Sequence, residues 1–412
     1  MIGSKKKDRS FRKKSVVWVS PLLLDIQFHK TSRIEILRHL AELGYDVHLI
    51  AVQSKKRYSP KNQSIDVVQI PLRFAPLISQ IFFGAITFLF LPLYIVRKRP
   101  EFIIVEPNIG TLGFMWKPLL SRLMKFKVIL DIRSTPVDIT SGLRAYFKRF
   151  QFNISVLMAK KMFDGMTIIT WAMRKEVSEK FDLDAESIGI WPDAASIELF
   201  THEKNVDYGL KLRKKFGLSS KFIIFCHGHI GLLRGALESS EAIVKTKKEY
   251  PDIVLFLLGT GAAATLNAIK NLIQKHGIED RVILHEPVSY EDVPKYIAMC
   301  DVGIVPLPNI PIWRNQCPLK LLEYLAMKRT VIVTDIPANR EIVGDRKCGI
   351  YVSSCDPAEI AEAMVFAYVN REKLEEWGKI GRMIVIQEYN WGKAAKDLET
   401  YLLKVESGLA GW

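Results

Sequence analysis

Short apolar runs alternate with longer amphipathic stretches along almost the whole chain. Runs rich in Val and Ile predict buried strands, and apolar residues spaced three to four apart predict helices. The first series of predicted strands covers residues 15–20, 47–52, 64–70, 102–105, 128–132 and 165–169. The second series covers residues 222–226, 254–258, 282–284, 302–305, 330–333 and 349–352. Strands that alternate with helices build parallel sheets, so we predict an α/β fold with two Rossmann-like domains.

The predicted helices lie between these strands and complete the domain plan. They cover residues 33–43, 237–249, 265–276, 293–298, 319–326, 357–369 and 391–405. The charged stretch 200–221, partly helical at 208–216, is typical of a linker between domains. We therefore expect an N-terminal domain over residues 1–200 and a C-terminal domain over residues 201–385, which face each other across a cleft. Residues 386–412 are expected to carry a helix that returns to the N-terminal domain.

Composition supports two ordinary globular domains and restricts the classes of binding partner. The 412 residues are 49% apolar and 25% charged, which excludes a disordered or collagen-like chain. Lys and Arg number 59 against 44 Asp and Glu, and a net charge of +15 should attract nucleic acid, anionic lipid or a phosphorylated small molecule. The five cysteines all lie in the second half without a C-x-x-C pair. We interpret them as free thiols in a reducing compartment rather than a disulfide framework or a zinc site.

Two segments have the composition of membrane sequences. The basic start at residues 5–14, followed by an apolar run at 16–24, imitates a signal peptide, but no small-residue cleavage site follows, and we favour a first buried strand. Residues 74–96 contain no charged residue and are long enough to span a bilayer. Arg73 and residues 97–99 put basic flanks on both sides, which opposes a single crossing. We expect peripheral attachment at the membrane interface; a core helix and a true span are the alternatives.

A glycine-rich segment follows the first strand of the second series. Residues 228–235 read Gly-His-Ile-Gly-Leu-Leu-Arg-Gly and precede a predicted helix. Glycines let the backbone approach an anion, the helix start offers free N–H groups, and Arg234 adds a guanidinium that matches phosphate oxygens. The segment is neither a Walker A loop nor a G-x-G-x-x-G fingerprint, and a tight turn with a surface arginine would have the same sequence.

A second segment places a cation and a carboxylate on one face of a predicted helix. Lys320 and Glu323 lie three residues apart, just after Pro318, which suits a first helical turn. Such a pair can hold a diphosphate and a vicinal diol, because a carboxylate accepts two hydroxyl hydrogen bonds. A solvated salt bridge within the helix is the alternative.

The second half of the chain resembles the nucleotide-sugar-binding domain of glycosyltransferase family 4, which comprises retaining enzymes of the GT-B fold. The features that carry this resemblance are residues 228–235, Leu257-Leu258-Gly259 with Gly261, residues 301–306 and residues 318–326. The Pro-Leu-Lys-x-x-Glu-Tyr order within the last of these is the most specific part. Residues 191–200 and 389–391 extend the similarity more loosely over most of the chain.

The resemblance implies roles for residues on the donor side. Glu323 matches the second glutamate of the family's E-x₇-E motif, which holds the ribose hydroxyls of the donor, and Arg234 matches one basic residue of its phosphate pair. Lys320 is expected on the diphosphate, and Val288 lies where the family's backbone pairs with the base. The donor set also includes Gly228, His229, Gly231, Asn315 and Leu319. Asn315 and His229 depart from the family's glutamate and second basic residue, which leaves the donor's identity open.

The acceptor side is expected in the first domain. Asp131 and Arg133 follow a predicted strand, and His29 and Ser32 follow the first strand, so all could orient an acceptor hydroxyl. A salt bridge at the strand end explains Asp131 and Arg133 equally well. We expect Asp131 to act with Arg234 and Lys320 in catalysis. The chemistry is expected to need no metal or other cofactor, because cationic groups would stabilise the departing diphosphate.

The sequence therefore predicts a retaining glycosyltransferase that moves a sugar from a nucleoside-diphosphate sugar to an acceptor hydroxyl. We expect a lipid-linked or glycan acceptor, an anionic membrane surface as partner, and a cytoplasmic protein that is peripheral on the inner face of the cell membrane. A sugar-nucleotide epimerase of the same fold and a non-catalytic membrane-surface protein are alternatives. Nucleic acid is not expected as a partner, since no recognition motif accompanies the positive charge.

Overall fold

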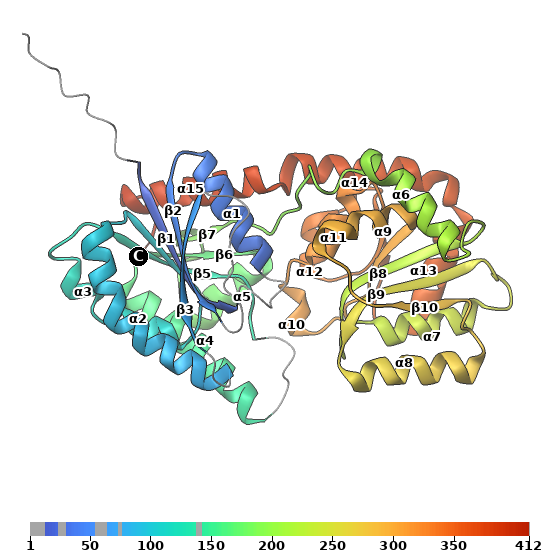
Figure 1. Ribbon diagram of the computed structural model, residues 1–412, viewed down its shortest axis with the longest axis horizontal. Coiled ribbons are helices and arrows are strands. Elements are labelled where there is room, and N and C mark those ends of the chain that lie inside the picture. The colour runs from blue at the N-terminus through green and yellow to red at the C-terminus, as the bar shows by residue number, and fades with distance from the viewer. Residues whose placement is uncertain (1–12, 24–29, 54–63, 73–75, 137–141, 412) are drawn as a thin grey trace, which may run out of the picture.

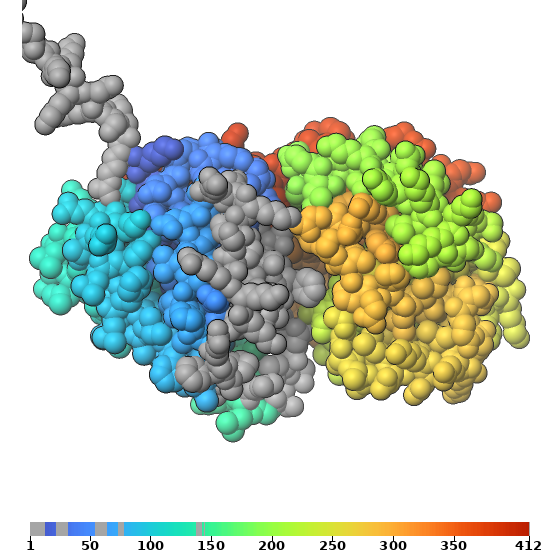
Figure 2. Space-filling view, in the orientation of Figure 1, coloured from blue at the N-terminus to red at the C-terminus, as the bar shows by residue number. Residues whose placement is uncertain are grey.

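The computed structural model describes residues 13–23, 30–53, 64–72, 76–136 and 142–411, which form two α/β domains side by side (Figure 1). Each domain is built on one parallel sheet with helices on both faces. The predicted architecture of two Rossmann-like domains is confirmed. The space-filling view shows the same two bodies in contact (Figure 2).

The N-terminal sheet has the strand order β3-β2-β1-β4-β5-β6-β7 among the described residues. Its strands are β1 (Ser15–Leu23), β2 (Asp46–Gln53), β3 (Ile65–Pro71), β4 (Phe102–Val105), β5 (Lys127–Ile132), β6 (Gly165–Ile168) and β7 (Ile188–Ile190). Alternate residues of β1 enter different cores: Val16 and Trp18 pack on one face, and Val17 and Val19 on the other. Because both faces are buried, these strands read as continuous apolar runs.

Helices cover both faces of this sheet and bury its two sets of side chains. The helices and helical turns of this half are α1 (Lys30–Glu42), α2 (Pro76–Lys98), η1 (Ile109–Phe114), α3 (Lys117–Leu120), α4 (Leu143–Met162), α5 (Trp171–Phe181) and η2 (Ala185–Ser187). Helix α1 shares a core with Trp18, whereas α2, α4 and α5 contribute to the core on the opposite face.

The C-terminal sheet has the order β10-β9-β8-β11-β12-β13. Its strands are β8 (Phe222–Ile230), β9 (Ile253–Gly261), β10 (Val282–His285), β11 (Val302–Val305), β12 (Thr330–Thr334) and β13 (Gly349–Val352). The surrounding helices and turns are α6 (His202–Lys215), α7 (Ala236–Thr246), α8 (Ala263–His276), η3 (Tyr290–Asp292), α9 (Val293–Met299), α10 (Pro311–Arg314), α11 (Leu319–Ala326), α12 (Pro337–Val343), α13 (Pro357–Val369), η4 (Arg371–Lys373) and α14 (Leu374–Glu388). Every predicted strand is present, with ends that differ by a few residues.

The charged stretch 200–221 is more than a linker. It contains α6, which packs closely on α9: a Cβ added at Gly209 would lie 2.6 Å from the carbonyl carbon of Ala298. Arg213 donates from Nε to the carbonyl oxygen of Met299 at 2.6 Å and pairs with Asp301. The predicted linker is therefore an integral helix of the C-terminal domain.

The final helix, α15 (Trp391–Glu406), crosses to the N-terminal domain (Figure 1). Trp391, Leu398 and Leu402 share a buried core with Trp18. The hydroxyl oxygen of Tyr401 accepts a hydrogen bond from the backbone N–H of Met166 at 2.9 Å. The chain thus passes between the domains twice, once on the way out and once on the way back.

Candidate functional site

The end of β8 brings the glycine segment under α11. Gly228 has a φ of +104°, a conformation that side chains rarely adopt, and a Cβ there would lie 4.0 Å from the Cε and Nζ atoms of Lys320. Lys320 also reaches the Sγ atom of Cys226 at 3.8 Å. The ammonium group therefore lies over the backbone of the glycine segment, half-buried.

Glu323 lies one turn further along α11 and is enclosed by polar groups. Its residue exposure is only 3%, and its Oε2 atom is 2.8 Å from Nε2 of His227. The hydroxyl of Tyr290, from η3, also bonds to this carboxylate. Burial raises the pKa of Tyr290 well above its usual 10, so the hydroxyl stays protonated and donates.

Tyr324 fixes the hydrogen-bonding state of His227. The backbone N–H of His227 donates to the Tyr324 hydroxyl oxygen at 3.1 Å, and Nδ1 of the same histidine lies 2.9 Å from that oxygen. Burial raises the pKa of Tyr324 well above its usual value, so the hydroxyl keeps its hydrogen. With that hydrogen directed at Nδ1, the imidazole carries a hydrogen on Nε2 and donates it to Glu323.

Arg234 occupies the turn into α7. Its guanidinium carbon lies 4.7 Å from the ring centroid of Trp313 on α10, a cation–π contact. The following residue, Gly235, has a φ of +74°, and a Cβ there would lie 2.0 Å from the carbonyl oxygen of Pro306. His229 is exposed, and Gly231 beside it is buried. Lys320, Glu323 and Arg234 are thus all gathered around the carboxyl end of β8.

Three further residues of the predicted donor set lie at different places. Asn315 is buried and donates from Nδ2 to Glu176 of α5, so its amide contacts the N-terminal domain rather than the glycine segment. Leu319 also packs against the core that α1 and α15 share with the N-terminal sheet. Val288 is half-buried in the loop between β10 and η3. The side-chain contacts of Asn315 and Leu319 thus lie towards the N-terminal domain, and the donor roles of all three residues stay predictions.

Contacts between the domains come from the carboxyl ends of both sheets. The carbonyl oxygen of Asn315 accepts from Oγ1 of Thr170 at 2.9 Å, and Nε2 of Gln316 donates to Oγ1 of Thr135 at 3.2 Å. Glu341 of α12 accepts the backbone N–H groups of Trp171 and Ala172 at 3.0 and 2.7 Å. Its carboxylate therefore caps the start of α5 from the other domain.

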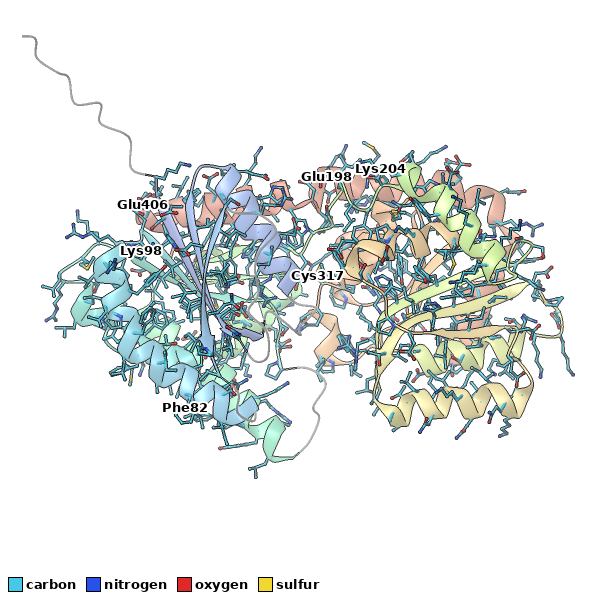
Figure 3. The ribbon with its side chains drawn as sticks, viewed as in Figure 1. Phe82, Lys98, Glu198, Lys204, Cys317 and Glu406 are labelled. Atoms are coloured by element: carbon cyan, nitrogen blue, oxygen red, sulfur yellow. The ribbon has the colours of Figure 1, made fainter. Side chains whose placement is uncertain are left out.

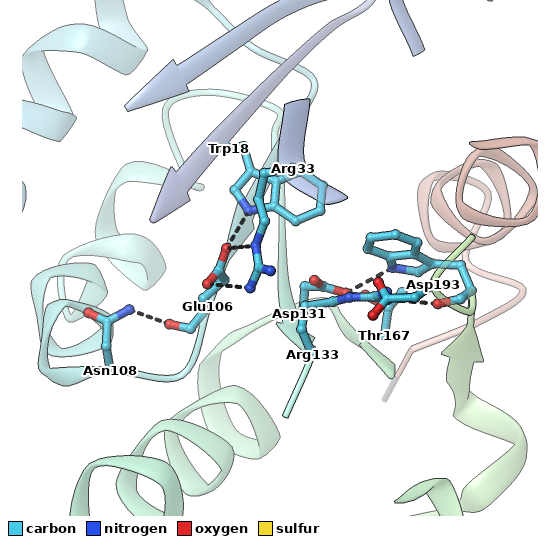
Figure 4. Close-up of polar contacts among 9 residues, drawn as sticks. Trp18, Arg33, Glu106, Asn108, Asp131, Arg133, Thr167 and Asp193 are labelled. Atoms are coloured by element: carbon cyan, nitrogen blue, oxygen red, sulfur yellow. Dashed lines mark hydrogen bonds and ion pairs between the residues drawn. The ribbon is translucent and has the colours of Figure 1, made fainter. Parts of the chain in front are cut away.

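On the N-terminal side, Asp131 is enclosed at the end of β5 (Figure 4). Its Oδ1 atom accepts from Oγ1 of Thr167 at 2.7 Å and from Nε1 of Trp191 at 2.8 Å. Burial raises the pKa of Asp131 to about 6, while the nearby Arg133 opposes this shift. The side chain is 0% exposed, so it cannot meet an acceptor in this conformation.

Arg133 is also committed to its own domain. It donates from Nη1 to the carbonyl oxygen of Trp191 at 2.7 Å, stacks on that indole at 3.5 Å and forms an ion pair with Asp193. The expectation that Asp131 and Arg133 touch the acceptor directly is therefore not met here. Both side chains instead fix the segment that leads from β7 towards the C-terminal domain.

A second buried cluster lies beside them, at the end of β4. Glu106 accepts from Nε and Nη2 of Arg33 at 2.9 and 3.0 Å and from Nε1 of Trp18 at 3.1 Å (Figure 4). Burial opposes ionisation of Glu106, but the Arg33 guanidinium outweighs it and the pKa of this carboxyl is lowered. Ser32 is buried next to Arg33, and His29 lies outside the described residues.

Sequence reasoning missed several of these polar residues. His227 sits within an apolar strand and Tyr290 in a loop, and nothing local marks either as a neighbour of Glu323. Glu106 had a usable signal, because an acid follows the buried strand β4 directly. Among the described residues, no group of three or more His, Cys, Asp and Glu side chains could hold a metal ion.

Comparisons with known proteins identify related sequences and folds. Residues 210–383 match the family described as glycosyl transferases group 1. The chain is 24% identical over 234 residues to the alpha-D-kanosaminyltransferase of Streptomyces kanamyceticus, covering 57% of this chain and 58% of that one. It is 23% identical over 253 residues to a D-inositol 3-phosphate glycosyltransferase of Arthrobacter, covering 60% and 58%. The match thus spans somewhat more than half the length of these curated relatives.

Solved structures extend the similarity to the whole chain. A glycosyltransferase of Rickettsia africae superposes with a TM-score of 0.72 at 15% identity, covering 96% of this chain and all of that one. HepE of Anabaena, solved with UDP and glucose, gives a TM-score of 0.70 at 14% identity, covering 94% and 99%. The chain therefore has the two-domain GT-B fold, and its residues 210–383 are similar to the glycosyl transferases group 1 family.

Proposed function

We propose that this protein is a retaining glycosyltransferase of family 4, which transfers a sugar from a nucleoside-diphosphate sugar to an acceptor hydroxyl. The observation that carries the proposal is the arrangement on α11. This helix holds Lys320 over the backbone of Gly228 and, one turn later, Glu323 against His227. Structural neighbours were solved with UDP, with UDP-glucose and with ADP, which supports a nucleotide sugar as the ligand.

The donor's ribose would bind to Glu323. A carboxylate offers about four acceptor positions, so the hydrogen bonds from His227 and Tyr290 leave room for two ribose hydroxyls. Because the side chain is nearly enclosed, a ligand would meet only its open edge. The base would lie beside the loop that contains Val288, with backbone groups as partners.

The diphosphate would lie over the glycine segment. Lys320, beside Gly228, and Arg234, beside Gly231, would supply positive charge, and backbone N–H groups of residues 228–231 would supply dipoles. Negative charge develops on the leaving diphosphate as the glycosidic bond breaks, and preorganised cations stabilise it. In this proposal protein cations carry that role. Contacts between Glu341 and α5, and between Asn315 and Glu176, hold the domains together and would exclude water from the reaction.

The acceptor would approach from the N-terminal domain, at the carboxyl edge of its sheet, where Arg133 stacks on the buried Trp191. We propose a lipid-linked or glycan acceptor at the cytoplasmic face of the membrane, and a peripheral location for the protein. The apolar character of α2 supports a membrane location. Its residues Ile78–Lys98 form a helix long and apolar enough to cross a bilayer, with a mean hydropathy of 1.9, yet only 33% of that apolar stretch is buried.

A donor screen followed by product analysis tests the proposal. Melting temperature is measured with UDP-, GDP-, ADP- and dTDP-sugars, for the wild type and for Glu323→Gln. Glu362→Gln, an exposed change on α13, serves as the matched control. We expect one nucleotide class to stabilise the wild type and the control but not Glu323→Gln. Conversion of the donor into an epimer without any acceptor would contradict transfer, and equal stabilisation of all three proteins would contradict the ribose contact.

A further inference from the structure

Helix α2 has two apolar stripes where a surface helix has one. The inner stripe includes Phe83, Leu91 and Ile95, which are buried in the core of the N-terminal domain. The outer stripe repeats at the same helical spacing and is also apolar. Its large side chains are between 37% and 72% exposed: Ile78, Ile81, Phe82, Phe88, Leu89, Phe90, Leu93 and Val96. A helix that faces water normally shows polar side chains on this side.

Helix α4 repeats the same feature next to α2. Gln151 of α4 donates to Gln80 of α2 at 2.9 Å, and both helices cover the same face of the sheet. The exposed stripe of α4 contains Leu143, Tyr146, Phe150 and Leu157, of which Leu143 is 89% exposed. We call these exposed side chains of the two helices the α2–α4 face. Its α2 part lies on the outer surface of the N-terminal domain (Figure 2).

The C-terminal domain shows that this is a local property. Helix α8 packs on its sheet in a comparable position but exposes Asn267, Lys270, Asn271 and Lys275. The apolar outer stripes of α2 and α4 therefore have no counterpart on α8. Exposed apolar surface of this extent marks a site of interaction.

Basic side chains border the α2–α4 face. Arg97 and Lys98 end α2, Arg99 follows directly, and the exposed Lys148 and Arg149 lie on α4. Figure 3 places Lys98 at the end of α2 opposite Phe82. Apolar and aromatic side chains flanked by Lys and Arg suit a bilayer, where the first enter the acyl boundary and the second meet anionic headgroups.

The inner stripe shows that α2 cannot be surrounded by lipid. A Cβ at Gly84 would lie 3.3 Å from the carbonyl oxygen of Ile109, and a Cβ at Gly113 would lie 3.0 Å from the backbone nitrogen of Phe88. The backbones of α2 and η1 are therefore in close contact, and the helix is part of the fold. This arrangement is compatible with a helix that lies along the membrane and incompatible with one that spans it alone.

We propose that the α2–α4 face docks on an anionic lipid bilayer and places the carboxyl edge of the N-terminal sheet at the membrane. Both helices follow strands β3 and β5, so they begin at that edge, where the acceptor would bind. Ile78, Phe82, Leu143 and Tyr146 lie at this end and the basic residues of α2 at the other. The inference extends the proposed function by naming the surface that delivers a membrane-bound acceptor, but docking itself needs no transfer activity.

Co-sedimentation of the full chain with vesicles tests the docking surface. Phosphatidylcholine vesicles with and without phosphatidylglycerol are compared for the wild type and for the double variant Leu89→Glu/Leu93→Glu. These leucines are 71% and 72% exposed, so the fold should tolerate the change. The control is Leu210→Glu/Val369→Glu, at positions of 60% and 59% exposure in the other domain.

We expect the wild type and the control to bind the anionic vesicles in a salt-sensitive manner. The α2 variant should bind about tenfold more weakly or worse, because it loses apolar area and adds negative charge. Circular dichroism and donor binding in solution should be the same for all proteins.

Equal vesicle binding by both double variants would overturn the proposal. So would a lipid-free dimer that only the α2 variant disrupts, which would assign the face to a second copy. A wild type that binds no nucleotide-sugar donor would contradict the proposed function, but this result would not affect the docking proposal.

Discussion

His227 and Glu323 meet through a 2.8 Å hydrogen bond between the apolar strand β8 and helix α11, which follows three strands later in the chain. The direction of this bond is set by Tyr324, whose hydroxyl faces Nδ1 of the histidine and leaves Nε2 as the donor. Tyr324 thus orients His227, and His227 in turn holds the buried carboxylate of Glu323 in one orientation. In the proposed reaction His227 acts as a positioning residue, because it fixes the group that binds the ribose.

Replacing His227 should therefore weaken donor binding more than it slows the chemical step. For His227→Ala we expect the KM for the donor to rise about 10- to 150-fold, from the loss of one charge-assisted hydrogen bond of about 1.5–3 kcal/mol, with a smaller fall in kcat. His227→Gln, which can still donate to Glu323, should recover part of the affinity. His276→Gln on α8 is the control. A fall in kcat alone, with KM unchanged, would argue against this role.

Lys320 should affect turnover. Lys320→Ala removes a cation over the glycine segment, and we expect kcat to fall about 10²–10³-fold, as for other preorganised anion sites. The melting temperature of the free protein should hardly change, since among the described residues the hydrogen-bonding contact of the ammonium group is a long one, to Sγ of Cys226 at 3.8 Å. Lys270→Ala, an exposed change on α8, provides the comparison. Turnover of Lys320→Ala close to the wild-type value would remove this residue from the mechanism.

Glu341 should control how firmly the domains are held together. Glu341→Ala removes the acceptor for the N–H groups of Trp171 and Ala172, at a cost of about 1 kcal/mol, while Thr170 still caps α5 through Met173. We expect a larger radius of gyration in small-angle scattering for the variant, and no change for Glu362→Ala. Identical scattering curves for wild type and Glu341→Ala would show that other contacts suffice.

Asp131 should make the protein less stable as the pH rises. Its pKa is raised from 3.8 to about 6 by burial, with Glu106 acting in the same direction and Arg133 and Arg33 against it. The folded chain therefore holds this proton more tightly than the unfolded chain, and the free energy of unfolding falls between about pH 4 and pH 6.

Asp131→Asn tests this sign. The amide oxygen can still accept from Thr167 and Trp191, and no charge is left to bury. We expect the variant to be more stable than the wild type by about 1–3 kcal/mol at pH 7, with the difference gone near pH 4. Urea unfolding at the two pH values measures it, with the exposed Asp207→Asn as control. A variant that is less stable at pH 7 would mean that the ionised carboxylate stabilises the fold.

The strands were predictable because parallel strands with two buried faces leave continuous apolar runs. Strand β7 was missed, since Ile188–Ile190 is three residues long with a central glycine. The sequence of helix α6 predicts a linker because its exposed side is densely charged, whereas its close packing through Gly209 on Ala298 depends on residues far along the chain. Pattern alone shows burial and periodicity, but not which distant element supplies the contact.

The donor residues show the same limit. The i,i+3 spacing of Lys320 and Glu323 predicted that both lie on one face of a helix. In the structure this helix, α11, lies beside the end of β8. Their partners His227 and Tyr290 lie at separations that no local pattern encodes. Asn315 was expected beside the donor, but the partner of its amide, Glu176, belongs to the other domain. Contacts across a domain boundary depend on how the two folds meet, which one sequence does not reveal.

A crystal structure of the full chain with the nucleoside diphosphate that most raises its melting temperature tests the central claim most directly. We predict that the diphosphate lies over Gly228 within hydrogen-bond reach of Lys320 and Arg234, and that the ribose hydroxyls bond to Glu323. A nucleotide bound elsewhere, or one whose ribose faces away from Glu323 while the phosphates avoid Lys320, would contradict the account.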